Sequence, residues 1–133
     1  MHHREAIRDV LASYCQLCDD GRFAEWAELF TDDARLHVMG TTHHGRAAVR
    51  SFIEAAQPPE RRGKHLVTNV LVALDGDRAR TWSDYLFVDR NGTPTSVGRY
   101  HDELRREEGR WRFELREIVF LGDTPEVAHP VPG

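Results

Sequence analysis

Several features that mark specialised classes of protein are scarce or missing in this sequence of 133 residues. Its only cysteines are Cys15 and Cys18, which suits a reducing compartment and indicates no disulfide framework. No apolar run approaches the roughly 20 residues that a membrane-spanning helix needs. The opening Met-His-His-Arg-Glu is not followed by the apolar stretch of a signal peptide. We therefore expect a cytoplasmic protein that makes no membrane contact.

Basic charge is also in short supply, which argues against nucleic acid as a partner. The chain has 18 Lys and Arg against 22 Asp and Glu, a net charge of −4 and a pI near 6.0. Proteins that bind phosphate backbones normally carry a basic excess on one face. The basic residues Arg61, Arg62 and Lys64 lie among acids and are predicted to form a solvated loop.

Motifs for cofactors and metals are absent as well. The sequence contains no glycine-rich phosphate loop and no G-x-S-x-G nucleophile turn. The pair Cys15 and Cys18 has no second cysteine pair or suitably spaced histidine pair to complete a zinc site. Because both cysteines fall in the middle of a predicted helix, we interpret them as core residues. We expect neither a cofactor nor a metal.

What is present describes an ordinary globular domain. Hydrophobic residues make up 40% and charged residues 30% of the chain. The length of 133 residues fits one domain. We predict a single domain over residues 1–133, with its core at about 4–121 and an irregular tail at 122–133.

The first half of the chain has mainly helical periodicity. Apolar side chains recur at three- and four-residue steps from about residue 4 to 19 and predict a long amphipathic helix. A second, short helix is predicted over 23–30, with Asp20 as its cap and the cluster Thr31-Asp32-Asp33 at its end. A strand over 34–39, a turn over 40–45 and a third helix ending at Pro58-Pro59 follow.

The second half alternates apolar and polar residues, which is typical of strands. Turn signals at residues 75–77, 90–92 and 107–109 divide it into four long antiparallel strands, predicted over 65–74, 78–89, 95–106 and 110–121. Such a curved sheet must bury one face, and three amphipathic helices are available to cover it. The expected fold is therefore α+β, and curling the sheet around one long helix leaves a conical cavity.

Several stretches resemble SnoaL-like proteins, whose superfamily includes scytalone dehydratase, ketosteroid isomerase and nuclear transport factor 2. The similar segments, which extend from about residue 6 to 116, are Tyr14-Cys-Gln-Leu-Cys-Asp19-Asp-Gly, Leu29-Phe30-Thr-Asp-Asp33-Ala34, Gly45-Arg-Ala-Ala-Val49, His65-Leu-Val-Thr-Asn69, Asp75-Gly-Asp-Arg-Ala79, Gly98-Arg-Tyr100 and Gly109-Arg-Trp111-Arg112. The resemblance implies a cone-shaped, cystatin-like α+β barrel, a small hydrophobic ligand and a homodimer. It specifies the fold more closely than the function, because the superfamily hosts many activities.

The nearest branch contains the scytalone-dehydratase-like and bile-acid-dehydratase-like enzymes, which need no cofactor. The resemblance implies a tyrosine and an aspartate from the first helix and a histidine from the sheet, matching Tyr14, Asp19 and His65 here. These dehydratases place a further His or Asp on the following strand. At that position this sequence offers Ser83 or Asp84, and the register from sequence does not decide which one faces inward.

The residue types themselves support this set. Asp19 ends the first predicted helix, where the helix dipole disfavours a negative charge and a functional reason for it is expected. Imidazole can take and return protons near neutral pH, and a carboxylate such as Asp19 could fix the tautomer of His65. Tyr14 lies in the apolar stripe, yet its hydroxyl needs a partner if buried.

Four further residues are predicted to contact substrate: Trp26, Asn69, Asp84 and Arg99. Alternation along the strand places Asn69 on the same face as His65 and Val67. For Asp84 and Arg99, alternation alone leaves the inward and the outward face equally open.

Three functions are consistent with these patterns. The leading hypothesis is a cofactor-independent lyase or isomerase, such as a dehydratase or a polyketide cyclase, acting on a small oxygenated hydrophobic compound. The second is a non-catalytic ligand-binding or dimerisation module, in which Trp82, Phe87, Tyr100 or Phe113 would fill the cone. The third is an epoxide hydrolase that uses Asp84 and Arg99.

Overall fold

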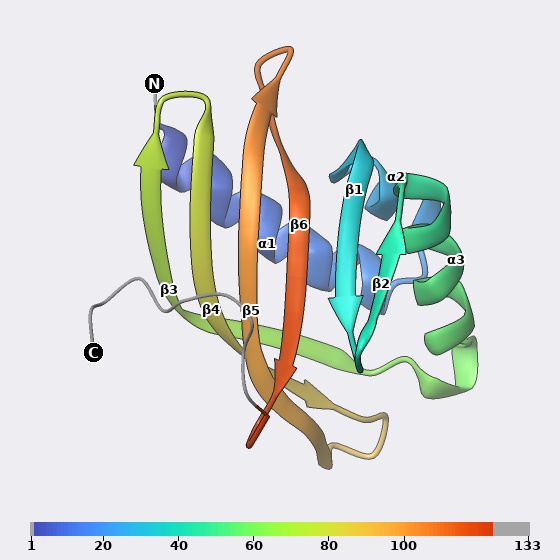
Figure 1. Cartoon of the computed structure of the whole chain (residues 1–133). Coiled ribbons are helices and arrows are strands. Elements are labelled where there is room, and N and C mark those ends of the chain that lie inside the picture. The colour runs from blue at the N-terminus through green and yellow to red at the C-terminus, as the bar shows by residue number, and fades with distance from the viewer. Residues whose placement is uncertain (1, 124–133) are drawn as a thin grey trace.

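One mixed sheet of six strands forms the body of the protein. The computed structural model describes residues 2–123, and the sheet has the strand order β2-β1-β6-β5-β4-β3. The long helix α1 (His3–Asp19) crosses one face of the sheet, while α2 (Phe23–Ala27) and α3 (Arg46–Ala56) lie beside β1 and β2 (Figure 1). This is the predicted α+β fold, with a curved sheet wrapped around helices.

The first helix packs as its apolar stripe predicts. The side chains that it buries are Ile7, Leu11, Tyr14, Cys15 and Cys18. Burial raises the pKa of Cys15 to about 11 and that of Cys18 to about 12, so both thiols stay protonated. No helix among residues 2–123 has the length and apolar character to cross a membrane.

The chain between α1 and α2 differs from the prediction that Asp20 caps the second helix. Asp20 ends α1 instead, and the N-cap of α2 is Arg22, which makes no side-chain cap bond. Gly21 adopts a φ of +70°, and its N–H donates to the carbonyl of Cys18. A Cβ at Gly21 would meet only the mobile end of the Arg62 side chain, so it is the positive φ, rather than space, that favours glycine here.

Strand β1 (Phe30–Val38) begins four residues earlier than predicted, because Phe30, predicted to end the second helix, and the cluster Thr31-Asp32-Asp33 enter the sheet. Phe30 pairs in parallel with Phe113 of β6 (Arg110–Phe120), a contact across 83 residues that the local helical pattern does not reveal. The predicted turn over 40–45 was also wrong, since Thr41–His44 forms a short strand, β2, antiparallel to β1. Tertiary pairing thus overrides the local signal.

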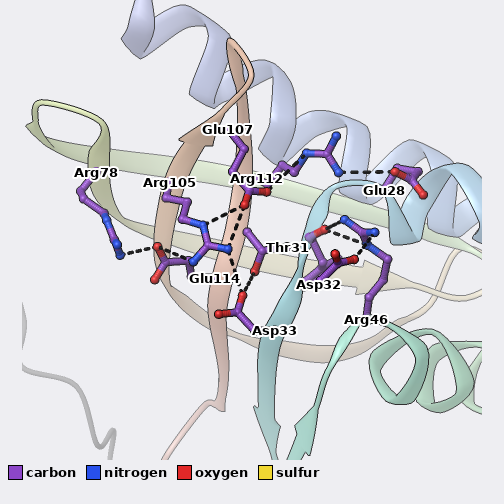
Figure 2. A network of polar contacts seen from close by, with 11 residues as sticks. Glu28, Thr31, Asp32, Asp33, Arg46, Arg78, Arg105, Glu107, Arg112 and Glu114 are labelled. Atoms are coloured by element: carbon purple, nitrogen blue, oxygen red, sulfur yellow. Dashed lines mark hydrogen bonds and ion pairs between the residues drawn. The ribbon is translucent and has the colours of Figure 1, made fainter.

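A polar network stabilises the irregular start of β1, where the pairing with β6 shifts register between Phe30 and Arg35. Arg46 donates to Asp32 at 2.6 Å and to the Phe30 carbonyl, while Arg105 pairs with Asp33 at 3.1 Å (Figure 2). The hydroxyl of Thr31 donates to Asp33 and, together with Arg105, lowers the pKa of that carboxyl. The acidic cluster predicted to end a helix therefore anchors a strand.

The remaining elements follow the prediction to within one or two residues. After α3 comes a 3₁₀ turn, η1, at Pro59–Arg61. The long antiparallel strands are β3 (Lys64–Asp75), β4 (Arg78–Val88), β5 (Pro94–Glu107) and β6. The predicted irregular tail lies outside the described residues from position 124 onwards.

Candidate functional site

The end of α1 and the start of β3 meet at a buried carboxylate–histidine pair. Oδ1 of Asp19 lies 2.6 Å from Nδ1 of His65, and the two side chains are 3% and 9% exposed. The same carboxylate also accepts the backbone N–H of His65, at 3.0 and 3.2 Å. Asp19 therefore anchors the first residues of β3 and orients the imidazole at the same time.

This arrangement determines which ring nitrogen can act. When Nδ1 donates to Asp19, the neutral imidazole carries its lone pair on Nε2. That nitrogen is then free to remove a proton, and the carboxylate supports the imidazolium that results. Asp19 lies at the C-terminal end of α1, where the helix dipole disfavours a negative charge. The hydrogen bonds from His65 offset that unfavourable interaction.

Tyr14 occupies the centre of the interior, one helical turn before the Asp19 end of α1. It is 2% exposed, and its ring lies 6.5 Å from that of His65 between centroids. Further ring contacts join it to Trp26 at 5.3 Å and to Tyr100 at 5.7 Å. Burial raises the pKa of Tyr14 well above its usual value although nearby Arg116 lowers it, so the phenol is a neutral hydrogen-bond donor.

Beneath Tyr14 lies a buried ion pair that the sequence analysis missed. Nε and Nη2 of Arg116 donate to the two oxygens of Asp102 at 2.7 and 2.9 Å, and both side chains are fully buried. Thr81 donates to the same carboxylate at 2.9 Å. Burial lowers the pKa of Arg116, but Asp102 outweighs burial and holds that pKa above its ordinary value. A permanent cation is thereby fixed in the core.

The guanidinium of Arg116 is stacked among aromatic rings. It lies 4.2 Å from the ring centre of Tyr14, 3.7 Å from that of Tyr100 and 4.5 Å from that of Phe113. Cation–π attraction of this kind strengthens where water is excluded. The cation therefore contributes to the electrostatics of the interior that Tyr14 faces.

Three buried polar groups around these rings lack a hydrogen-bond partner of normal geometry among residues 2–123. They are Nη1 of Arg116, Nε1 of Trp26 and Oγ of Ser83. Trp26 and Arg116 both contact the Tyr14 ring, and Ser83 is directly opposite Tyr100 in the β4–β5 ladder. An unpaired buried donor costs about 1–3 kcal/mol, so an acceptor placed beside these groups would stabilise the interior.

The ladder also decides between Ser83 and Asp84. Ser83 shares the α1-covered face with Tyr100, whereas Asp84 pairs with Arg99 on the opposite face of the sheet. Asp84 accepts from Nε of Arg99 at 2.7 Å and from Nδ2 of Asn69 at 2.8 Å. Of the two residues that the resemblance left open, the one that faces inward is therefore Ser83.

The predicted inward orientation of Asn69 was wrong. Between Thr68 and Leu71 the β3–β4 register shifts, and Asn69 adopts a φ of 52°. This bulge turns its side chain away from His65 and toward Asp84. Asn69, Asp84 and Arg99 thus form one polar group on the outer face, while Trp26 lies inside with Tyr14, Asp19 and His65.

A surface groove lies next to the candidate site and has Phe87 in its wall, the residue opposite His65 in the β3–β4 ladder. The two rings are 4.6 Å apart between centroids. Phe87 forms part of the wall of a depression of about 520 Å³ between the end of α3 and η1 on one side and the β4–β5 turn on the other. Of the residues expected to fill the cone, Tyr100 and Phe113 lie inside, whereas Trp82 is on the outer face opposite His101.

Metal ligation finds no support in the described part of the chain. Within residues 2–123 no group of three or more His, Cys, Asp or Glu side chains is arranged to hold an ion. The ring of His43 packs on Phe52, with 4.4 Å between centroids. The side chains that the site itself offers for chemistry are Asp19, His65, Tyr14 and the buried Arg116.

A curved sheet wrapped around helices is the cystatin-like fold of proteins similar to nuclear transport factor 2. Within that class, the chain belongs to the SnoaL-like domain family, whose sequence model matches residues 1–117. None of the curated protein sequences matches the chain significantly.

Solved structures agree with this assignment. The protein of unknown function Rv3472 from Mycobacterium tuberculosis superimposes with a TM-score of 0.82 at 29% identity, over 89% of this chain and 71% of that one. A candidate scytalone dehydratase from Novosphingobium aromaticivorans gives 0.80 at 22% identity, over 96% and 89%, which shows a shared fold. A protein of that organism described as similar to nuclear transport factor 2, with a cystatin-like fold, gives 0.75 at 30% identity, over 91% and 83%.

Proposed function

We propose that this protein is a cofactor-independent lyase or isomerase that removes a proton next to a carbonyl group of a small hydrophobic, oxygenated compound. The observation that carries the proposal is the 2.6 Å contact between Asp19 and Nδ1 of His65, which leaves Nε2 as the free base. A buried base oriented by a carboxylate is costly to maintain in a protein that only packs a core.

The other interior groups have roles that follow from charge. As His65 takes the proton, negative charge develops on the carbonyl oxygen of the substrate. The neutral hydroxyl of Tyr14 can donate to that oxygen, and the unpaired N–H groups of Arg116 and Trp26 can add to the stabilisation. Loss of a β-hydroxyl group, migration of a double bond or ring closure can each follow from this common enolate.

Exchange of substrate protons with solvent tests the proposal whichever product the enzyme forms. Small cyclic ketones and β-hydroxyketones in deuterated buffer should lose their α-proton signals in proton NMR faster with the protein than without it. Enolisation precedes dehydration, double-bond migration and ring closure alike, so exchange reports the step that they share. Rates equal to the buffer control across a broad set of ketones would contradict the proposal.

A non-catalytic ligand-binding module is the second candidate, and one observation favours it. The rings of Tyr14, Trp26, Phe30, Tyr100 and Phe113 pack against one another within the cone, as expected for a filled interior. The unpaired donors in the same region favour a bound oxygen-containing molecule instead. Epoxide hydrolysis receives no such support, since Asp84 and Arg99 lie on the outer face.

The outer face of the sheet supports the proposal of a homodimer. Leu66, Leu86 and Val97 form one apolar row across β3, β4 and β5, and Leu66 and Val97 are 53% and 44% exposed. An exposed apolar row beside the Asp84–Arg99 ion pair is suited to contact with a second copy.

Replacing Val97 by lysine should weaken this association, because it places a charge in the apolar row. Sedimentation of the wild-type protein at micromolar concentration should show a dimer, and the Val97→Lys variant should shift toward monomer. As a matched control, Met39→Lys changes an exposed apolar residue of the β1–β2 turn and should leave the dimer intact. A wild-type monomer at these concentrations would contradict the proposal.

A further inference from the structure

We infer that the groove at Phe87 binds the acidic arm of the ligand, so that the substrate is a planar apolar ring carrying a carboxylate or another anionic group. This inference rests on the proposed function, because it concerns what the same site accepts. It goes further by naming Arg61 as a specificity-determining residue, with Arg90 beside it.

The geometry of the groove links a ring-binding surface to two cations. Phe87 contacts the ring of His65 and also forms part of the groove wall. The opposing walls carry Arg61 from η1 and Arg90 from the β4–β5 turn. Nη1 of Arg90 donates to the carbonyl of Pro59, so this guanidinium bridges the two walls. A ring against Phe87 would place a short substituent toward these guanidinium groups.

The charged residues of the groove differ in whether they already have partners within the protein. Glu60 and Asp89 also line the groove. However, Asp89 accepts the backbone N–H groups of Asn91 at 2.9 Å and Thr93 at 3.0 Å, which ties its carboxylate to the turn. Arg61 forms no ion pair with any residue in the described part of the chain. It is therefore the cation that remains available to a ligand.

The two segments that flank the groove carry a net positive charge, whereas the whole protein is negatively charged. The segments 59–64 and 89–91 contain four basic residues and two acidic ones, whereas the full chain carries a net charge of −4. The residues that line the groove balance in formal charge, with Arg61 and Arg90 against Glu60 and Asp89. The neighbouring Arg62 and Lys64 supply the positive excess that attracts anions to this end of the protein. Because a guanidinium can bind a carboxylate through two parallel hydrogen bonds, Arg61 suits a carboxylate well.

A pair of ligands that differ in a single charge tests this inference. Naphthaleneacetate and the same isomer of naphthaleneacetamide present one ring with a charged or a neutral arm. In calorimetric titrations of the full chain, the acetate should bind about five-fold more tightly than the amide, a difference typical of a partly exposed ion pair. The preference should shrink as salt is added.

The variants Arg61→Gln and Arg110→Gln form a matched pair. Arg110 begins β6 at the β5–β6 turn, so its replacement removes the same charge away from the groove and should preserve the preference. Arg61→Gln should make the affinities for acetate and amide equal. Equal affinities in the wild type, a preference that survives Arg61→Gln, or no binding of either compound would each overturn the inference.

His65→Ala separates this inference from the proposed function. The variant should lose proton exchange yet keep the preference for the acetate, because Arg61 is untouched. A preference for the acetate without proton exchange in the wild type would reject the enzyme and retain the anion site. Exchange without a preference would do the reverse.

Discussion

Proton exchange catalysed by the protein should fall by about 10²–10⁴-fold in the His65→Ala variant, the range expected when a positioned general base is lost. Nε2 of His65 is the base in the proposed reaction, and Tyr14, with its pKa raised by burial, cannot replace it near neutral pH. Exchange rates by proton NMR and the melting temperature should be measured on the same samples, so that a loss of folding is not mistaken for a loss of chemistry.

The Asp19→Asn variant gives a sharper version of the same experiment. Its amide can still hydrogen-bond to Nδ1 of His65, but an N–H donor there leaves the proton of the neutral ring on Nε2. The shape of the site is kept while the base is converted into a donor, so exchange should fall by about 10²-fold or more.

A suitable control is His43→Ala, which removes a histidine whose ring packs on Phe52 rather than in the interior. It should leave exchange unchanged. Full activity in both His65→Ala and Asp19→Asn would reject the proposed base, whatever the control shows.

The Asp102→Ala variant should lose about 3–5 kcal/mol of the free energy of unfolding, because Arg116 then remains as an uncompensated charge in the core. Both side chains of this pair have no exposed surface, and Thr81 also loses its acceptor. Urea denaturation followed by tryptophan fluorescence measures the change. A loss below about 1 kcal/mol would mean that water reaches Arg116 and that the pair is not buried in solution.

A double replacement separates stability from function. Asp102→Leu combined with Arg116→Met removes both charges and keeps apolar volume, a change that is often neutral or stabilising for a buried ion pair. If Arg116 serves the reaction through its free Nη1, the stable double variant should still exchange protons more slowly than the wild type. Wild-type exchange in a stable double variant would assign the pair a purely structural role.

The sequence predicted the second half of the fold well because the determinants there are local. Asp75-Gly76-Asp77 carries a turn signal within three residues, and Gly76 adopts the positive φ that the turn needs. The alternation in β4 follows from a sheet with one covered face. The first half was less predictable, since Phe30 is drawn into the sheet by Phe113, far along the chain. The strand β2 is a short segment of Thr and His without apolar alternation.

The residues of the candidate site also differ in how well the sequence predicts their positions. Asp19 and His65 could be paired from sequence because a carboxylate at the C-terminal end of a helix is conspicuous and the family resemblance supplied its partner. Asn69 was misplaced because a bulge breaks the alternation without leaving a sequence signal. Asp102 could have been noticed, since it lies between Tyr100 and Leu104 on the same face of β5, where a charge must be paired.

The contact between Asp19 and His65 closes a loop of 46 residues, from the end of the first helix to the start of the third strand. Everything between them, including α2, the β1–β2 hairpin and α3, is enclosed by that single contact. The two residues are far apart in the sequence, so their contact can form only after the ends of a long loop have met. If His65 is the base, as proposed, we expect its tautomer to be fixed only once this loop has closed, so that partly folded chains carry all of the residues of the site without its chemistry.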